Sequence, residues 1–180
     1  VRIFNKYSIY LQAVSRDGIP LEIIKKKLPT INNKIDSVLR SIVNFKLELT
    51  IDNKGDIKES FFFTENKSDA LPLSSGSGSQ KFICSVAIRE ALHYISCLVK
   101  PSFCIIDEGF GTLDKNKLQD IGNVFNYLKN KYKSVIVITH LDDVKDCVDK
   151  IIQVRKTSDG VEPKFLEENP EAGLSQITFS

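Results

Sequence analysis

The sequence of 180 residues contains no methionine, not even at its first position. This absence leads us to expect a piece of a longer protein. No apolar run approaches the roughly 18 residues needed to span a bilayer, and no signal peptide is visible. We therefore expect an intracellular location, in cytoplasm or nucleus, and no membrane partner. The net charge of +2 is too small to indicate a class of partner.

The cysteines also exclude common site types. The chain has four of them, scattered and without a Cys-x-x-Cys pair: Cys84, Cys97, Cys104 and Cys147. This spacing does not suit a zinc site or a disulfide framework. We expect four reduced thiols, as is usual inside cells.

A phosphate-binding P-loop is absent as well. Residues 76–81, Gly-Ser-Gly-Ser-Gln-Lys, resemble one loosely. A Walker A loop needs glycine directly before its lysine and Ser or Thr after it. Here Gln80 precedes Lys81 and Phe82 follows, and no other segment fits.

The most informative segment present is an apolar run, residues 103–106, that ends in Asp107 and Glu108. Such a run suits a strand buried on both faces. Ligands bind beyond the carboxyl ends of parallel strands, where a nucleotide and its metal would lie. Neighbours on an extended segment point to opposite sides, so one carboxylate can hold Mg²⁺ while the other faces an attacking water. The alternative is a turn-capping aspartate beside a solvated glutamate.

Two further segments favour the catalytic interpretation. A glycine- and serine-rich loop, residues 73–81, leads directly into a helix of about twenty residues, and a helix N-terminus favours an anion. The alternative there is a flexible linker. Residues 134–138 form a second apolar strand, followed by Thr139 and His140, which places His140 at the same sheet edge as the two acids. The alternative for His140 is a structural histidine hydrogen-bonded to backbone.

The N-terminal third is predicted to be helical. Ile3, Tyr7, Tyr10 and Val14 recur with the spacing of a coiled-coil stripe, although an ordinary amphipathic helix fits equally. Residues 17–20, Asp-Gly-Ile-Pro, break this helix. A second helix is expected to end near Leu28, and a third to start at Pro29, with a stripe formed by Ile31, Ile35, Val38 and Ile42.

The remaining elements are predicted from the alternation of apolar and polar residues and from residues that favour turns. Residues 45–51 and 57–64 predict a hairpin, in which the three phenylalanines 61–63 belong to the core rather than to a base-stacking platform. Helices are predicted over residues 114–131 and 142–147. A second hairpin is predicted from residues 148–154 and 161–166. No element is assigned after residue 166. The basic residues 25–27 suit a solvated helix face or contact with DNA phosphates.

In this order, the motifs resemble the C-terminal lobe of the ATPase head in the SbcC-like branch of the SMC (structural-maintenance-of-chromosomes) superfamily, within the ABC ATPases. Residues 77–81 match the signature motif, residues 105–108 the end of Walker B, residues 112–114 the D-loop, and His140 the switch histidine. The resemblance covers roughly residues 73–155. The chain departs from the usual signature in two places, since Gly76 occupies the leucine position and Ser79 that of the second glycine. A signature register starting at Leu73-Ser74 remains possible.

The resemblance implies ATP and Mg²⁺ as cofactors and a role for each matched residue. Asp107 positions Mg²⁺ largely through water, Glu108 polarises the hydrolytic water and His140 contacts the γ-phosphate. The signature residues bind ATP held by the opposite head, and Asp114 links the two sites across the dimer. Those signature residues are Ser77, Gly78, Ser79 and Gln80.

The fold expected is therefore α/β, a mostly parallel sheet flanked by helices, with an N-terminal coiled-coil segment and a β-hairpin. Residues 1–43 form the helical segment, 44–166 the ATPase lobe and 167–180 a tail. The implied partners are a Walker A lobe of the same protein, a second identical head, double-stranded DNA and an SbcD-type nuclease. The activity implied is ATP hydrolysis for DNA repair. The alternatives are a non-catalytic DNA-clamping scaffold and an ABC transporter subunit.

Overall fold

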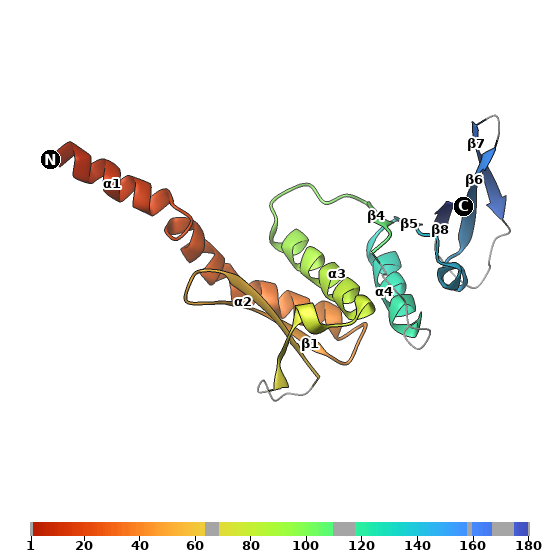
Figure 1. The fold of residues 1–180 in the computed structure, drawn as a ribbon, viewed down its shortest axis with the longest axis horizontal. Helices are drawn as coiled ribbons and strands as arrows, with labels where there is room; N and C mark the ends of the chain where they lie inside the picture. Colours follow the sequence, from red (N-terminus) through yellow and green to blue (C-terminus); the bar gives the residue numbers. More distant parts are fainter. Residues whose placement is uncertain (1, 64–68, 110–117, 158–159, 167–174, 180) are drawn as a thin grey trace. The chain divides into compact units, whose positions relative to one another are not determined.

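A computed structural model of the chain describes residues 2–63, 69–109, 118–157, 160–166 and 175–179 (Figure 1). The chain forms two compact units, and each is described by itself. The first comprises Val1–Arg40, Asn44–Gly76 and Ala87–Ser96, and the second comprises Ser41–Val43, Ser77–Val86 and Cys97–Ser180. No helix of the described ranges is both long and apolar enough to cross a membrane.

Two helices open the first unit, α1 (Arg2–Val14) and α2 (Ile19–Leu39). The break predicted between them is confirmed, and Gly18 makes it tight. The Gly18 N–H donates to Ser15 O at 3.0 Å, and a Cβ on Gly18 would lie 2.3 Å from Ala13 O. Only glycine fits this turn without a shift of the backbone.

The predicted end of a helix before Pro29 is wrong, because α2 runs through Pro29 without interruption. Proline removes one backbone hydrogen bond and crowds the preceding turn. The apolar stripe after it compensates, since Ile31, Ile35, Val38 and Leu39 are all buried. The free energy gained by burying these four side chains exceeds the cost of a proline inside the helix.

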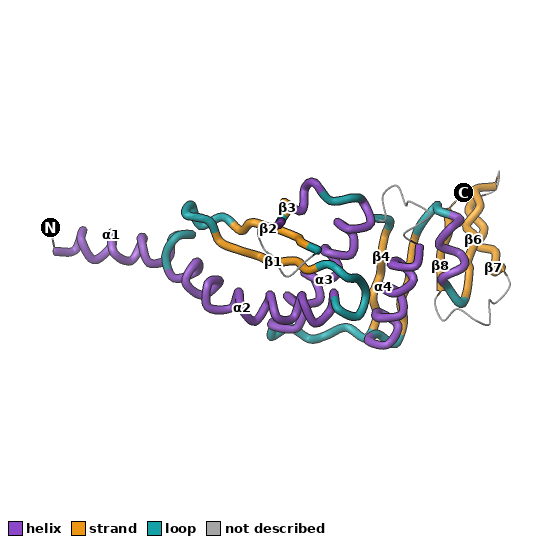
Figure 2. Tube along the Cα trace, turned by 90° about the horizontal axis from the view of Figure 1, so that it is seen from below, coloured by secondary structure: helices purple, strands orange, loops and turns teal. Residues whose placement is uncertain are grey.

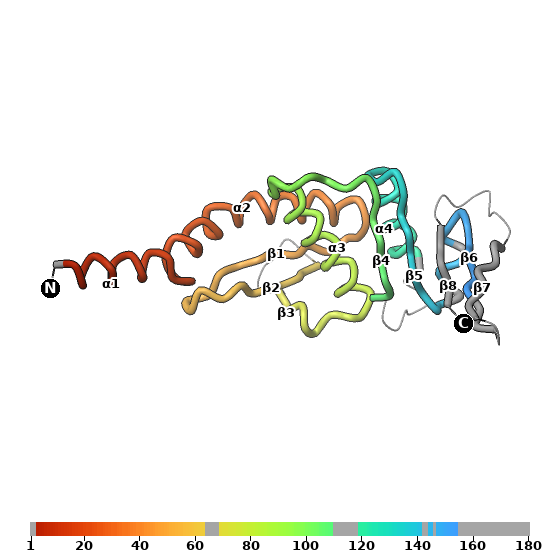
Figure 3. Tube along the Cα trace, turned by 90° about the horizontal axis from the view of Figure 1, so that it is seen from above, coloured from red at the N-terminus to blue at the C-terminus, as the bar shows by residue number. Residues whose placement is uncertain are grey.

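Beside α2 lies an antiparallel sheet in the order β1 (Lys46–Ile51), β2 (Ile57–Phe62) and β3 (Leu71–Pro72) (Figures 2 and 3). Asn32 of α2 closes the outer edge of β1 at Leu49. Its Nδ2 donates to Leu49 O at 2.9 Å, and its Oδ1 accepts the Leu49 N–H at 2.9 Å. One side-chain amide thus occupies backbone groups that a further strand would need.

The phenylalanines of this sheet pack edge to face. The rings of Phe45, Phe61 and Phe63 have centroids 5.8 to 6.0 Å apart. Phe61 and Phe62 are buried as predicted, whereas Phe63 is 60% exposed. The core prediction for Phe63 is therefore wrong, although its ring still contacts two neighbours.

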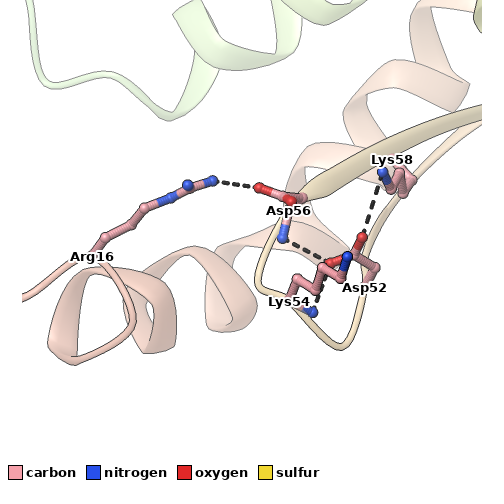
Figure 4. Close-up of polar contacts among 5 residues, drawn as sticks. All are labelled: Arg16, Asp52, Lys54, Asp56 and Lys58. Carbon is pink, nitrogen blue, oxygen red and sulfur yellow. Dashed lines mark hydrogen bonds and ion pairs between the residues drawn. The ribbon is translucent and has the colours of Figure 1, made fainter.

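The turn between β1 and β2 is held by a polar network (Figure 4). Asp52 Oδ1 accepts the N–H groups of Lys54 and Asp56, both at 2.9 Å, and Asp52 Oδ2 lies 3.5 Å from Lys58 Nζ. Arg16, in the turn between α1 and α2, donates to Asp56 Oδ1 at 2.6 Å. The hydrogen bond from the Asp56 N–H lowers the pKa of Asp52, and the Lys54 N–H and Lys58 add to this effect.

A short 3-10 turn, η2 (Leu73–Ser75), precedes α3 (Gly78–Ile95). The first half of α3, up to Val86, belongs to the second unit and its second half to the first. Its length of 18 residues agrees with the helix of about twenty residues predicted there, but it starts at Gly78, within the predicted loop 73–81 rather than after it.

The second unit is built on a five-stranded sheet with helix α4 (Leu118–Lys131) and the short η4 (Asp142–Cys147). Strand pairing is parallel except between β6 and β7. On α4, Ile121, Phe125 and Leu128 are buried. The α/β class with a mostly parallel sheet is confirmed. The order across the sheet is β4 (Phe103–Asp107), β5 (Ser134–Ile138), β8 (Ser175–Phe179), β6 (Lys150–Thr157) and β7 (Gly160–Leu166).

Two features of this sheet differ from the prediction. Strand β8, in the segment to which no element was assigned, lies between β5 and β6. Strand β4 is not buried on both faces, because Phe103 and Ile105 on one face are 52% and 47% exposed while Ile106 on the other is buried. β4 is one of the two edge strands in this order.

Candidate functional site

The predicted acids and the predicted histidine meet at one edge of the second unit's sheet. Asp107 ends β4 and pairs in register with Ile138, the last residue of β5. Because the pairing is parallel, Glu108 and His140 follow the two strand ends on the same side. The side chains of Asp107, Glu108 and His140 are all exposed. This edge is where a sheet of this class binds ligands.

Glu108 and His140 are in direct contact. His140 Nδ1 lies 3.1 Å from Glu108 Oε1, within hydrogen-bond distance. The Glu108 N–H donates to Ile138 O at 2.8 Å, which continues the β4–β5 ladder by one step. A carboxylate that accepts from an imidazole N–H fixes the ring's tautomer and leaves the other ring nitrogen to face a substrate.

The backbone at Glu108 is not extended, contrary to the basis of the sequence prediction. Its φ is +51°, and that of Gly109 is +97°. A left-handed conformation is uncommon for a residue with a side chain and costs about 1 kcal/mol. The direction of Glu108 therefore comes from a left-handed turn rather than from the alternation of a strand.

Thr139 supports the histidine, and the sequence analysis gave it no role. Its side chain is buried, and its Oγ1 accepts the Leu141 N–H at 3.1 Å. This bond fixes the turn that carries His140. The sequence signal was a hydroxyl residue directly before a polar residue at a strand end.

The residues predicted to form the signature motif cap the N-terminus of α3. Ser77 precedes the first helical residue, Gly78. The Ser77 N–H donates to Gln80 Oε1 at 2.8 Å, and the Gln80 N–H donates to Ser77 Oγ at 3.4 Å, which is a capping box. Ser79 is buried, with its Oγ 3.1 Å from Ser77 Oγ. Ser74 lies earlier, within η2.

Gly109, directly after Glu108, lies close to α3. A Cβ placed on Gly109 would lie 3.7 Å from Cδ2 of Phe82, a buried residue of α3. The first half of α3 and the turn at Glu108 and Gly109 are therefore neighbours within the second unit. Asp114 and the rest of the predicted D-loop lie outside the described residues.

The acidic pair suits a magnesium ion that is shared with phosphates. The described part of the chain holds no group of three or more His, Cys, Asp or Glu residues that could bind a metal by themselves. Mg²⁺ bound to a nucleotide commonly takes only one or two protein carboxylates, with water and phosphate oxygens as its other ligands. The exposed carboxylate of Asp107 fits that arrangement.

Known proteins with similar sequences include Rad50 ATPases. No protein-family profile matches the chain. An uncharacterized protein of Acanthamoeba polyphaga mimivirus is 35% identical over 167 residues, which is 84% of this chain and 12% of that protein. A probable DNA double-strand break repair Rad50 ATPase of Aquifex aeolicus is 27% identical over 68% of this chain and 13% of its own length. The Rad50 ATPase of Saccharolobus solfataricus is 25% identical over 87% of this chain and 19% of its own length.

Solved structures show the same fold. An SMC ATPase structure superposes with a TM-score of 0.65 at 17% identity, covering 82% of this chain and 89% of the other. The SMC head domain of Thermotoga maritima gives a TM-score of 0.57 at 18% identity, over 82% of this chain and 51% of the other. The Rad50 ATPases found by sequence and the SMC heads found by structure together support an ATPase head fragment of the SMC/SbcC superfamily. This SMC-type chain spans only about an eighth to a fifth of the length of the curated relatives described above.

Proposed function

We propose that this chain is part of an ATP-hydrolysing head that dimerises on ATP and couples hydrolysis to DNA tethering or nuclease control. The observation that carries the proposal is the contact of 3.1 Å between Glu108 and His140 beyond the ends of two parallel strands. A carboxylate and an imidazole side by side provide a base for water and a donor for phosphate. The names of the relatives, DNA repair ATPases and a nuclease subunit, support the biological setting.

In this proposal Asp107, Glu108 and His140 have different roles in hydrolysis. Glu108 orients and polarises the attacking water, and His140, held by Glu108 through Nδ1, turns Nε2 toward the γ-phosphate. Asp107 would hold Mg²⁺, largely through water, and a bound ion would offset negative charge on the phosphates. Thr139 keeps the histidine turn in place through the Leu141 N–H.

The signature residues act on a second copy of the head. Ser77, Gly78, Ser79 and Gln80 cap the start of α3, where backbone N–H groups favour an anion. A P-loop is absent from the sequence, so a Walker A lobe outside it must hold the nucleotide. The exposed face of β4, with Phe103 and Ile105, supports a further segment packed on that strand.

The first helix supports a coiled-coil partner at the base of the head. Ile3, Tyr7, Tyr10 and Val14 form one stripe of α1 and are all exposed. We propose that a second coiled-coil strand covers this stripe and that an SbcD-type nuclease binds at this base. The basic residues 25–27 on α2 are proposed to meet double-stranded DNA, although Lys25 also pairs with Glu22 at 2.9 Å.

ATP hydrolysis with and without a Walker A lobe tests the proposal. We expect negligible turnover by this chain alone, because it has no backbone loop to hold the phosphates. The chain combined with the Walker A lobe of its own protein should hydrolyse ATP, and Ser77→Arg should prevent ATP-driven dimerisation while leaving nucleotide binding to a single head intact. Turnover by the isolated chain, or dimerisation unaffected by Ser77→Arg, would contradict the proposal. Loss of dimerisation by Ser74→Arg instead would move the signature register by three residues.

A further inference from the structure

Two consecutive residues with a left-handed backbone follow strand β4. Glu108 has a φ of +51° and Gly109 a φ of +97°. The left-handed region open to residues with a side chain covers roughly +50° to +70°, so Glu108 lies inside it and Gly109 outside it. Glycine has no Cβ and adopts the φ of Gly109 without steric cost. Of the two residues, Gly109 therefore has the conformation that a side chain would not tolerate.

Backbone conformation, rather than lack of space, accounts for a glycine at position 109. Among the described residues, Phe82 is the one that a Cβ at this position would meet, with its Cδ2 at 3.7 Å, an ordinary van der Waals distance. An alanine side chain would therefore fit, but only at an unfavourable φ. Alanine relieves this strain by moving φ toward negative values, which changes the direction of the chain at the Glu108–Gly109 peptide.

The direction of the Glu108 side chain depends on this turn. The Glu108 N–H is held by Ile138 O at 2.8 Å, and the Glu108 Oε1 lies 3.1 Å from His140 Nδ1. Because the side chain is 62% exposed, close packing does little to fix its direction, and the backbone turn has the larger part. A left-handed φ at a glutamate persists where the neighbouring structure stabilises it.

We infer that Gly109 is a positioning residue for Glu108, because its left-handed backbone holds the turn in which the Glu108 carboxylate contacts His140. For its effect on hydrolysis the inference rests on the proposed function, in which Glu108 polarises the attacking water. Gly109 acts through Glu108 and not through a side chain of its own.

The first test compares two glycines of positive φ in the complete head, with its Walker A lobe. Gly109→Ala should lower the ATP turnover number by about 10- to 100-fold, the effect of displacing a catalytic group by about 1 Å, with little change in ATP affinity. The matched control is Gly55→Ala, because Gly55 has a φ of +79° and belongs to the first unit. Both variants should have a lower melting temperature, but Gly55→Ala should leave the turnover of the folded protein unchanged.

The second test follows the ring of His140 by nitrogen NMR of the same head without ATP. A carboxylate only accepts hydrogen bonds, so a neutral His140 ring in contact with Glu108 carries its hydrogen on Nδ1. Glu108→Ala gives the ring signals without the carboxylate. At alkaline pH, where the ring is neutral, Gly109→Ala should give those same signals, whereas Gly55→Ala should give the signals of the natural protein.

The outcomes distinguish this inference from the proposed function. Natural His140 signals in Gly109→Ala would overturn the inference, whatever the turnover of that variant, and would leave the proposed function standing. If both glycine variants lost turnover in proportion to their melting temperatures, Gly109 would contribute stability alone and the inference would be wrong as well. A natural head that hydrolyses no ATP would refute the proposed function, and the NMR comparison would still decide whether Gly109 positions Glu108.

Discussion

His140 Nδ1 lies 3.1 Å from Glu108 Oε1, although the two residues are 32 positions apart in the chain. The register of β4 and β5 produces this contact, because it pairs Asp107 with Ile138 and so aligns the strand ends. The two groups sit directly beyond hydrogen-bonded strands rather than on long loops. Side chains carried this way keep their separation with little loss of entropy when substrate binds.

Substitutions of Glu108 and of Asp107 should impair different steps of ATP hydrolysis. In a head completed by its Walker A lobe, Glu108→Gln should lower the ATP turnover number by about 100-fold or more, the usual contribution of a positioned base. Mg-ATP binding should persist, and the ATP-bound dimer should accumulate on size exclusion. Asp107→Asn should instead weaken Mg²⁺-dependent nucleotide binding. Identical behaviour of the two variants would contradict the division of roles.

The hydroxyl of Thr139, rather than its shape, should determine its contribution to stability and turnover. Thr139→Val keeps the volume but leaves the Leu141 N–H without its acceptor, at a cost of about 1–3 kcal/mol. We expect a lower melting temperature and, in the complete head, slower turnover with little change in ATP affinity. Thr139→Ser should retain most of both. If Val and Ser behaved alike, the hydroxyl would not be what holds the histidine turn.

Asn32 should be a larger contributor to stability than its neighbour Asn33. Asn32→Leu removes two hydrogen bonds from the backbone of Leu49, and we expect a loss of about 1–3 kcal/mol in the free energy of unfolding by urea. The control Asn33→Leu alters an exposed position of the same helix and should change stability by less than about 0.5 kcal/mol. Asn32→Leu should also favour self-association, since it uncovers the edge of β1. Equal effects of the two changes would contradict this role.

The lowered pKa of Asp52 leads us to expect a loss of folding stability at acid pH. The Asp56 N–H, with Lys54 N–H and Lys58, lowers the pKa of Asp52 below its ordinary value of 3.8. A carboxyl whose pKa is lower in the folded state stabilises the fold fully above 3.8 and loses that effect as the pH falls through its folded value. The difference in melting temperature between the natural protein and Asp52→Asn should therefore shrink below pH 3.8. Asp69→Asn, at an exposed aspartate outside this turn, serves as the control.

Most elements near the acidic edge were predictable because local signals agree there. One apolar run ends at Asp107 and the other at Ile138, just before two polar residues. The Ser77–Gln80 spacing of a capping box marks the start of α3. The positions of Asp107, Glu108 and His140 at one sheet edge followed from parallel pairing. Their roles in catalysis stay predictions.

The errors arose where distant packing outweighs local sequence. From the sequence, Pro29 indicates a helix boundary. Helix α2 continues past it because the apolar side chains that follow Pro29 on this helix are buried. Strand β8 has five residues and both of its partners are far away in the chain, so no local pattern marks it. The left-handed turn at Glu108 is equally invisible, because glutamate carries no preference for it.

The place of β8 has a consequence for the order in which the protein can fold. As the ribosome adds residues from the N-terminus, β4 and β5 can pair early, and β6 and β7 can form their hairpin. The two halves of the sheet cannot join until residues 175–179 have emerged, because β8 is the strand that connects them. Until then β5, the strand that leads to His140, has an unpaired edge that chaperones or other nascent chains can meet. A chain cut short before residue 175 would therefore have two separate pairs of strands in place of one sheet.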